Sequence, residues 1–65
     1  MLISVNGERH ETDAETLGAA LNSMGYGGRK IATAVNGRFV AATQRERTRL
    51  SDGDQIEVVA PMQGG

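Results

Sequence analysis

The segment SDGDQIEVVA, residues 51–60, gives the clearest indication of how this chain folds. Its first four residues predict a turn, because Asp side chains accept hydrogen bonds from backbone amides and the glycine adopts a positive φ readily. Residues 55–60 then predict a strand with Ile56 and Val58 on one face. Pro61 has no amide hydrogen to donate, so strand pairing should stop before it.

Two β-hairpins are predicted upstream of this strand. In residues 1–6, every second side chain (Met1, Ile3 and Val5) is apolar, which predicts a strand with one strongly apolar face. Residues 8–12 form a polar return strand. Residues 31–35 and 38–42 repeat the arrangement. An Asn-Gly dipeptide joins each pair, and this dipeptide fits the type I′ turn whose twist matches the strands.

One short helix is predicted between the two hairpins. Its apolar residues recur at the spacing of a single helix face: Leu17, Ala20, Leu21 and Met24. Asp13 and Thr16 are the candidate N-caps, and Gly25 is expected just past the helix end. Gly18 lies inside the helix, where glycine costs up to about 1 kcal/mol relative to alanine. We expect Gly18 to let a strand approach closely.

The element order is therefore strand-strand-helix-strand-strand-strand, with a last strand apolar enough to lie beside the first. We predict one α+β domain over residues 1–60, a mixed sheet of four to five strands with one helix packed on one face. The predicted core draws on every element: Ile3, Val5, Leu17, Leu21, Val35, Val40, Leu50, Ile56 and Val58.

Composition and charge argue against several classes of function. The chain has 7 basic and 8 acidic residues and a net charge of −1, without the basic excess that nucleic-acid binding requires. It has no cysteine and one histidine, His10, so we expect no disulfide, no metal site and no catalytic residues. No apolar run has membrane-spanning length, and no positive segment precedes the first apolar residues as in a secretory signal. We therefore expect a cytoplasmic protein that binds neither nucleic acid nor membrane.

The C-terminal residues PMQGG, 61–65, are the remaining candidate for function. We predict a flexible tail that reaches about 16–18 Å when extended, at about 3.3–3.6 Å per residue. Gly64 and Gly65 have no Cβ, so they fit a narrow channel in another protein. The terminal carboxylate is ionised at neutral pH and becomes an acyl donor only after esterification, for instance with AMP from ATP. The tail is therefore interpreted as a substrate arm.

The element order, the VNG turn at residues 35–37, the DGDQIEVV segment at 52–59 and the terminal QGG resemble the ubiquitin-like β-grasp sulfur carriers. The resemblance covers the whole chain and is strongest to the carriers of thiamine biosynthesis, the ThiS family. It implies that an E1-like adenylyltransferase (ThiF-like) uses ATP to adenylate the Gly65 carboxylate. A sulfur-donating enzyme would then replace AMP and leave a thiocarboxylate, which thiazole synthase (ThiG-like) would consume. The carrier itself would bind no cofactor.

The resemblance implies roles for few residues. Gly65 would take the sulfur, while Gly64, Gln63 and Met62 would enter the partner's active site with it. Docking is expected on the sheet face away from the helix, although the charged run TQRERTRL at 43–50 is by itself typical of a solvated surface. The docking candidates are Leu2, Phe39 and Val59 on that face, with Arg45, Arg47 and Arg49 at its rim.

Three alternatives stay open on the sequence. The small subunit of molybdopterin synthase is also a sulfur carrier, but that family tends to be longer. A ubiquitin-like modifier conjugated to lysines also ends in Gly-Gly. A non-catalytic β-grasp binding module would normally continue into a larger chain and carry a basic or aromatic surface, whereas this chain has one Phe, one Tyr and no Trp.

Overall fold

Two Asn-Gly hairpins form the outer parts of the sheet in the computed structural model, which describes residues 1–60. Each joins two antiparallel strands: β1 (Leu2–Val5) with β2 (Glu8–Glu11), and β3 (Ala32–Val35) with β4 (Arg38–Val40). Asn6 and Asn36 both have a φ of 52°, and the glycines after them have φ values of 86° and 83°. These are the two positive angles of a type I′ turn, and both predicted hairpins are confirmed.

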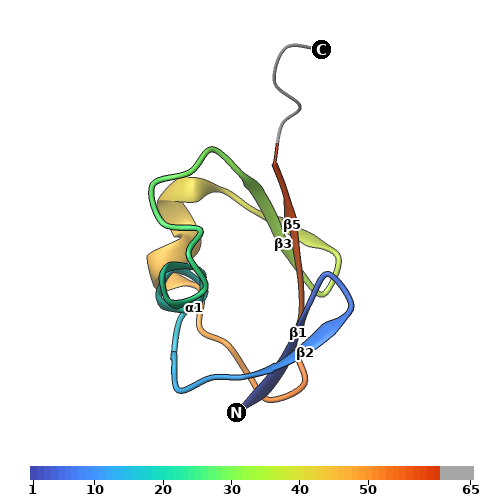
Figure 1. Cartoon of the computed structure of the whole chain (residues 1–65). Coiled ribbons are helices and arrows are strands. Elements are labelled where there is room, and N and C mark those ends of the chain that lie inside the picture. Colours follow the sequence, from blue (N-terminus) through green and yellow to red (C-terminus); the bar gives the residue numbers. More distant parts are fainter. Residues whose placement is uncertain (61–65) are drawn as a thin grey trace.

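The last strand, β5 (Gln55–Val59), lies between the hairpins and joins them into one sheet of order β2-β1-β5-β3-β4. It runs parallel to β1, with Val5 opposite Ile56, and antiparallel to β3, with Thr33 opposite Val58. Figure 1 shows β5 in red, rising through the middle of the sheet. The prediction that the last strand lies beside the first is confirmed.

Helix α1 (Leu17–Ser23) covers one face of the sheet (Figure 1). Thr16 caps it, because its hydroxyl accepts a hydrogen bond from the Ala19 amide at 3.2 Å. Leu17, Ala20 and Leu21 are buried against the strands, as the helical spacing predicts. Gly25 follows the C-cap residue Met24 with a φ of 88°.

The hydrophobic core lies between α1 and the sheet. Its buried members come from β1, α1, β5 and the segment before β5: Ile3, Val5, Leu17, Ala20, Leu21, Leu50, Ile56 and Val58. Val35 and Val40, which were also predicted for the core, are partly buried and pack against it. Thr33 is buried among them, and its hydroxyl donates to the Val40 carbonyl at 2.9 Å, so the buried polar group is satisfied.

A 3₁₀ helix, η1 (Ala42–Arg47), corrects the prediction for the second half of the chain. The strand predicted over 38–42 ends at Val40, and much of the charged run after it is helical. The Arg45 side chain gives a physical reason, because it fastens this segment to β3. Its Nε donates to the Thr33 hydroxyl at 3.1 Å, and a terminal nitrogen donates to the Ile31 carbonyl at 2.6 Å.

The expectation for Gly18 was also wrong in one respect. What approaches this glycine is the Glu46 carboxylate of η1 and not a strand. A Cβ at this position would collide with that carboxylate, which is the far end of a flexible and exposed side chain.

Candidate functional site

The candidate site is the C-terminal end of β5, which residues 61–65 follow in the chain (Figure 1). The predicted site residues Met62, Gln63, Gly64 and Gly65 lie outside the described residues, so their roles stay predictions. The structure shows which hydrogen bonds hold the last described strand, β5, as far as Val58.

Asn6 holds β5 close to its C-terminal end. The backbone of β1 pairs with β5 as far as the Asn6 amide, which donates to the Ile56 carbonyl at 2.9 Å. Beyond that point the Asn6 side chain takes over: its Oδ1 accepts from the Val58 amide at 2.8 Å, and its Nδ2 donates to the Val58 carbonyl at 3.1 Å. One carboxamide therefore extends the hydrogen-bonded edge of β5 past the end of its neighbour strand.

Asn36 holds the opposite end of β5 in a similar way. Its amide donates to the Gln55 carbonyl at 2.7 Å, and its Oδ1 accepts from the Gln55 amide at 2.9 Å. Its Nδ2 also donates to Asp54 at 2.9 Å. The sequence predicts both turns from their Asn-Gly pairs, but nothing local indicates that both side chains clamp the same distant strand.

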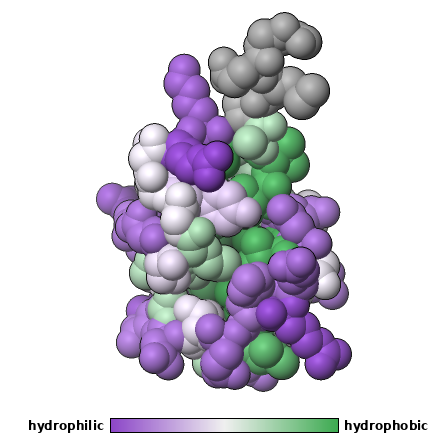
Figure 2. Space-filling view, in the orientation of Figure 1, coloured by the Kyte–Doolittle hydropathy of each residue, from purple (hydrophilic) through white to green (hydrophobic). Residues whose placement is uncertain are grey.

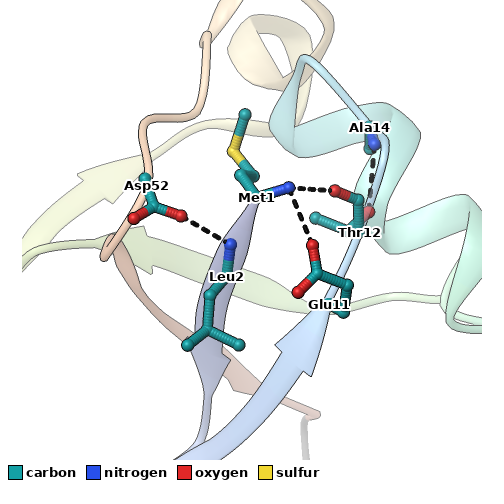
Figure 3. Close-up of polar contacts among 6 residues, drawn as sticks. All are labelled: Met1, Leu2, Glu11, Thr12, Ala14 and Asp52. Atoms are coloured by element: carbon teal, nitrogen blue, oxygen red, sulfur yellow. Dashed lines mark hydrogen bonds and ion pairs between the residues drawn. The ribbon is translucent and has the colours of Figure 1, made fainter.

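The turn before β5 is fastened to the start of β1, as Figure 3 shows. The Asp52 carboxylate accepts from the Leu2 amide at 2.7 Å, and the Gly53 amide donates to the Leu2 carbonyl at 2.7 Å. The N-terminal amino group of Met1 donates to the Thr12 carbonyl at 2.7 Å. Within the turn, Asp54 accepts from the Ser51 amide at 2.8 Å, which confirms that these Asp side chains bind backbone amides.

The structure separates the three apolar docking candidates along the open sheet face. Val59 lies on this face at the end of β5 and is 62% exposed. Phe39 lies on the same face of β4, two strands away and level with Glu57 in the middle of β5, and is 74% exposed. Ala34, opposite Phe39, and Ala32, opposite Val59, continue the same apolar surface.

Leu2 lies at the other end of the open face, and it is 39% exposed. A polar hollow of about 870 Å³ lies between the two ends, with Ser4, Arg9, Gln55 and Glu57 in its lining. Figure 2 shows separate hydrophobic areas at the upper right, in the middle and at the lower end of the molecule, with hydrophilic side chains beside them. Leu2 therefore does not form one continuous apolar patch with the other two candidates.

The three arginine candidates lie on the segment that packs against α1. Arg45 is partly buried and bound to β3, as described above. Arg49 forms an exposed ion pair with Glu15 at 3.3 Å, and Arg47 is exposed. Arg45 lines a groove together with Val59, whereas Arg47 and Arg49 do not, and the docking role of all three stays a prediction.

The described part of the chain offers little chemistry of other kinds. Within residues 1–60, no group of three His, Cys, Asp or Glu side chains lies close enough to hold a metal ion. His10 lies on β2, with Nε2 3.8 Å from the Glu8 carboxylate. No helix in the described residues has the length and apolar character needed to cross a membrane.

A mixed five-strand sheet with a parallel β1–β5 pair and one helix packed on one face is the architecture of a ubiquitin-like β-grasp domain. In this chain the last strand of that domain is followed by PMQGG at residues 61–65. The architecture places the chain in the class of ubiquitin-like β-grasp proteins.

Comparisons with known proteins narrow this class to one family. The ThiS family model matches residues 2–65. The sulfur carrier protein ThiS of Thermus thermophilus is 34% identical over 64 residues, which are 98% of this chain and 100% of that protein. The chain therefore belongs to the ThiS family of sulfur carriers.

Solved structures agree with the family assignment. The crystal structure of the thiamine biosynthesis protein ThiS from Geobacter metallireducens superposes with a TM-score of 0.82 at 26% identity, and the match covers all of both chains. A solution structure of a thiamine biosynthesis protein from the same organism gives a TM-score of 0.77 at 23% identity, over 100% of this chain and 88% of that one. The second match supports the fold alone.

Proposed function

We propose that this protein carries sulfur on the carboxyl group of Gly65 for thiazole formation in thiamine biosynthesis. The observation that carries the proposal is a sulfur-carrier family match that runs to Gly65 in a chain without cysteine. Such a chain has no thiol on which to form a persulfide, so its sulfur must be held elsewhere. The C-terminal carboxylate, once activated, is the group that can exchange oxygen for sulfur.

The proposed chemistry has three steps. A carboxylate oxygen of Gly65 attacks the α-phosphorus of ATP in an E1-like adenylyltransferase, and pyrophosphate leaves. The terminal sulfur of a persulfide on the sulfur-donating enzyme attacks the acyl carbon, and AMP leaves. A second thiol of the sulfur-donating enzyme attacks the enzyme-side sulfur of the resulting acyl disulfide and forms a disulfide with it, and Gly65 leaves with the other sulfur as a thiocarboxylate. The carrier acts as a co-substrate, and ATP is bound by the adenylating enzyme.

The fold supports this proposal through the way β5 is held. Asn6 fixes β5 as far as Val58, so the tail begins from an ordered strand end. Residues 61–65 span at most about 16–18 Å beyond it, which is enough to place Gly65 inside a partner's cleft. The match to the thiamine family favours thiazole synthase as the acceptor over the large subunit of molybdopterin synthase. We also propose that the protein carries out this role in the cytoplasm.

Intact mass spectrometry tests the proposal. The protein is incubated with ATP, a sulfur source and the ThiF-like adenylyltransferase of its host. We expect a mass gain equal to the replacement of one oxygen by sulfur, localised to Gly65 by fragmentation. No gain, with an adenylating enzyme shown to activate another carrier, would contradict the proposal.

The variant that lacks Gly65 is the matched control. It should show no mass gain and should melt at the temperature of the full chain, because every hydrogen bond described above lies within residues 1–60. A retained mass gain would place the sulfur on another residue.

A further inference from the structure

A shallow groove opens beside the C-terminal end of β5, and its volume is about 570 Å³. Its lining has an apolar part and a cationic part, which are called its floor and its edge. The floor consists of Ile31, Ala32, Ala42 and Val59, and the edge consists of Arg29 and Lys30. The groove lies between the start of β3, the start of η1 and the end of β5, so it is distinct from the polar hollow on the open sheet face.

The charges of this groove are of one sign. Arg45 also lines it, but its guanidinium is committed to Thr33 and the Ile31 carbonyl. Arg29 and Lys30 are exposed, and no carboxylate of residues 1–60 forms an ion pair with either of them. An adjacent hollow contains Glu46, whose carboxylate lies against Gly18. A chain with a net charge of −1 thus presents a local cationic surface at the base of its tail.

The position of the groove determines what must lie against it. Val59 belongs both to the groove and to the last residues of β5. An enzyme that draws Gly65 into a cleft must bring the mouth of that cleft to the end of β5, because residues 61–65 are short. This step rests on the proposed function.

We propose that the groove binds the adenylating enzyme, through an acidic segment at the mouth of its cleft that places one apolar side chain on the groove floor. Apolar burial contributes affinity at the floor, and carboxylates complement Arg29 and Lys30 at the edge. The adenylating enzyme captures the free carrier from solution, where complementary charge raises the rate of encounter. Acidic groups at its mouth would repel the anionic tail, and the cations of the groove offset that repulsion.

The test removes the positive charge of the groove in the full-length carrier. The double variant Arg29→Gln/Lys30→Gln is compared with Arg38→Glu, which changes the net charge equally at an exposed site away from the groove. Pyrophosphate release by the ThiF-like adenylyltransferase is measured against carrier concentration. We expect KM for the groove variant to rise about tenfold with little change in kcat, and the rise to shrink as salt is added. KM for the control variant should change by less than about twofold.

The outcomes separate the groove from the proposed function. If the wild-type carrier is adenylated and the groove variant keeps its KM, the groove proposal is wrong and the carrier function stands. An equal rise of KM in both variants would mean that net charge alone causes the effect, and would overturn the proposal. If the groove variant is adenylated normally but transfers sulfur to thiazole synthase more slowly, the groove does not bind the adenylating enzyme, and the proposal is wrong. If the wild-type carrier is not adenylated at all, the proposed function fails and the groove proposal with it.

The chain's own tail is the other possible occupant. Removal of residues 61–65 should leave the amide resonances of Ile31 and Ala42 unchanged in the free protein. A shift of these resonances would identify the tail itself as the segment that fills the groove, and would overturn the proposal.

Discussion

Asn6 does two things that a turn residue alone does not require. Its backbone adopts the positive φ of a type I′ turn, and its side chain bonds both the amide and the carbonyl of Val58. The Asn side chain has an oxygen that accepts hydrogen bonds and an NH₂ group that donates them, as the C=O and N–H of a peptide group do. Asn6 therefore supplies the hydrogen bonds of one further strand residue where β1 has already turned away.

Replacement of Asn6 by glycine isolates this contribution, because glycine accepts the same positive φ. We expect Asn6→Gly to lower the free energy of unfolding by about 1–2 kcal/mol, for two lost hydrogen bonds of about 1 kcal/mol each. Hydrogen exchange followed by NMR should show faster exchange of the Val58 amide.

The matched variant is Asn36→Gly, which removes a clamp of the same kind from the other end of β5. It should expose the Gln55 amide and leave Val58 protected. Equal protection of the Val58 amide in wild-type and Asn6→Gly proteins would show that the side-chain bonds do not hold the strand end.

The 3₁₀ helix η1 is linked to the sheet by the side chain of Arg45. Its residues are exposed or only partly buried, so burial provides little of its stability. Arg45 instead links the segment to β3 through two hydrogen bonds, one of them to the buried Thr33 hydroxyl. A planar guanidinium is suited to such a fixed pair of acceptors.

We expect Arg45→Gln to lower the free energy of unfolding by about 1–2 kcal/mol, because hydrogen bonds from a charged donor are lost. Urea denaturation measures this change. Arg47→Gln is the control on the same element, and since Arg47 is exposed its effect should stay within about 0.5 kcal/mol. Equal effects of the two substitutions would show that Arg45 does not anchor η1.

Helix α1 carries an internal glycine whose replacement should stabilise the protein. Gly18→Ala gains up to about 1 kcal/mol of helix propensity, and the Glu46 carboxylate that occupies the space can swing into solvent. We expect a melting temperature up to about 4–8 °C higher, the shift that 1 kcal/mol produces in a domain of this size. A lower melting temperature would show that Glu46 is held in place and cannot move aside.

For the molecule as a whole, the sheet has one face covered by α1 and one face open. The open face is apolar at the end that leads to the tail and polar in its middle. An enzyme that takes the tail meets the apolar end first. Phe39 should therefore contribute more to docking than Leu2, which lies at the far end.

Phe39→Thr and Leu2→Thr test which of the two side chains contributes more to docking. Threonine is used because its β-branched side chain is compatible with a strand. We expect Phe39→Thr to change the free energy of unfolding by less than about 0.5 kcal/mol, since Phe39 is 74% exposed. It should still raise KM for the carrier several-fold in the adenylation assay, and Leu2→Thr should raise it less. A larger effect of Leu2→Thr would mean that docking is centred on the polar end of the face.

Local patterns account for most of the fold. The two Asn-Gly turns, the alternation of Ile56 and Val58 and the helical spacing from Leu17 each act over a few residues, and all are confirmed. They are predictable because turn angles and side-chain periodicity depend on near neighbours. The Gly-Gly end was likewise visible without a structure.

The remaining features depend on residues that are distant in sequence. Asn6 and Val58 are 52 residues apart, and Arg45 and Thr33 are 12 apart. No local pattern reports such pairs, because a carboxamide or guanidinium can bond any backbone group that folding brings within reach. The amino-acid sequence alone was enough for the order of the strands and the helix, most of the core and the candidate Gly65. Folding in three dimensions was needed to end β4 at Val40, to set Leu2 apart from Phe39 and Val59 and to form a cationic groove beside the end of β5.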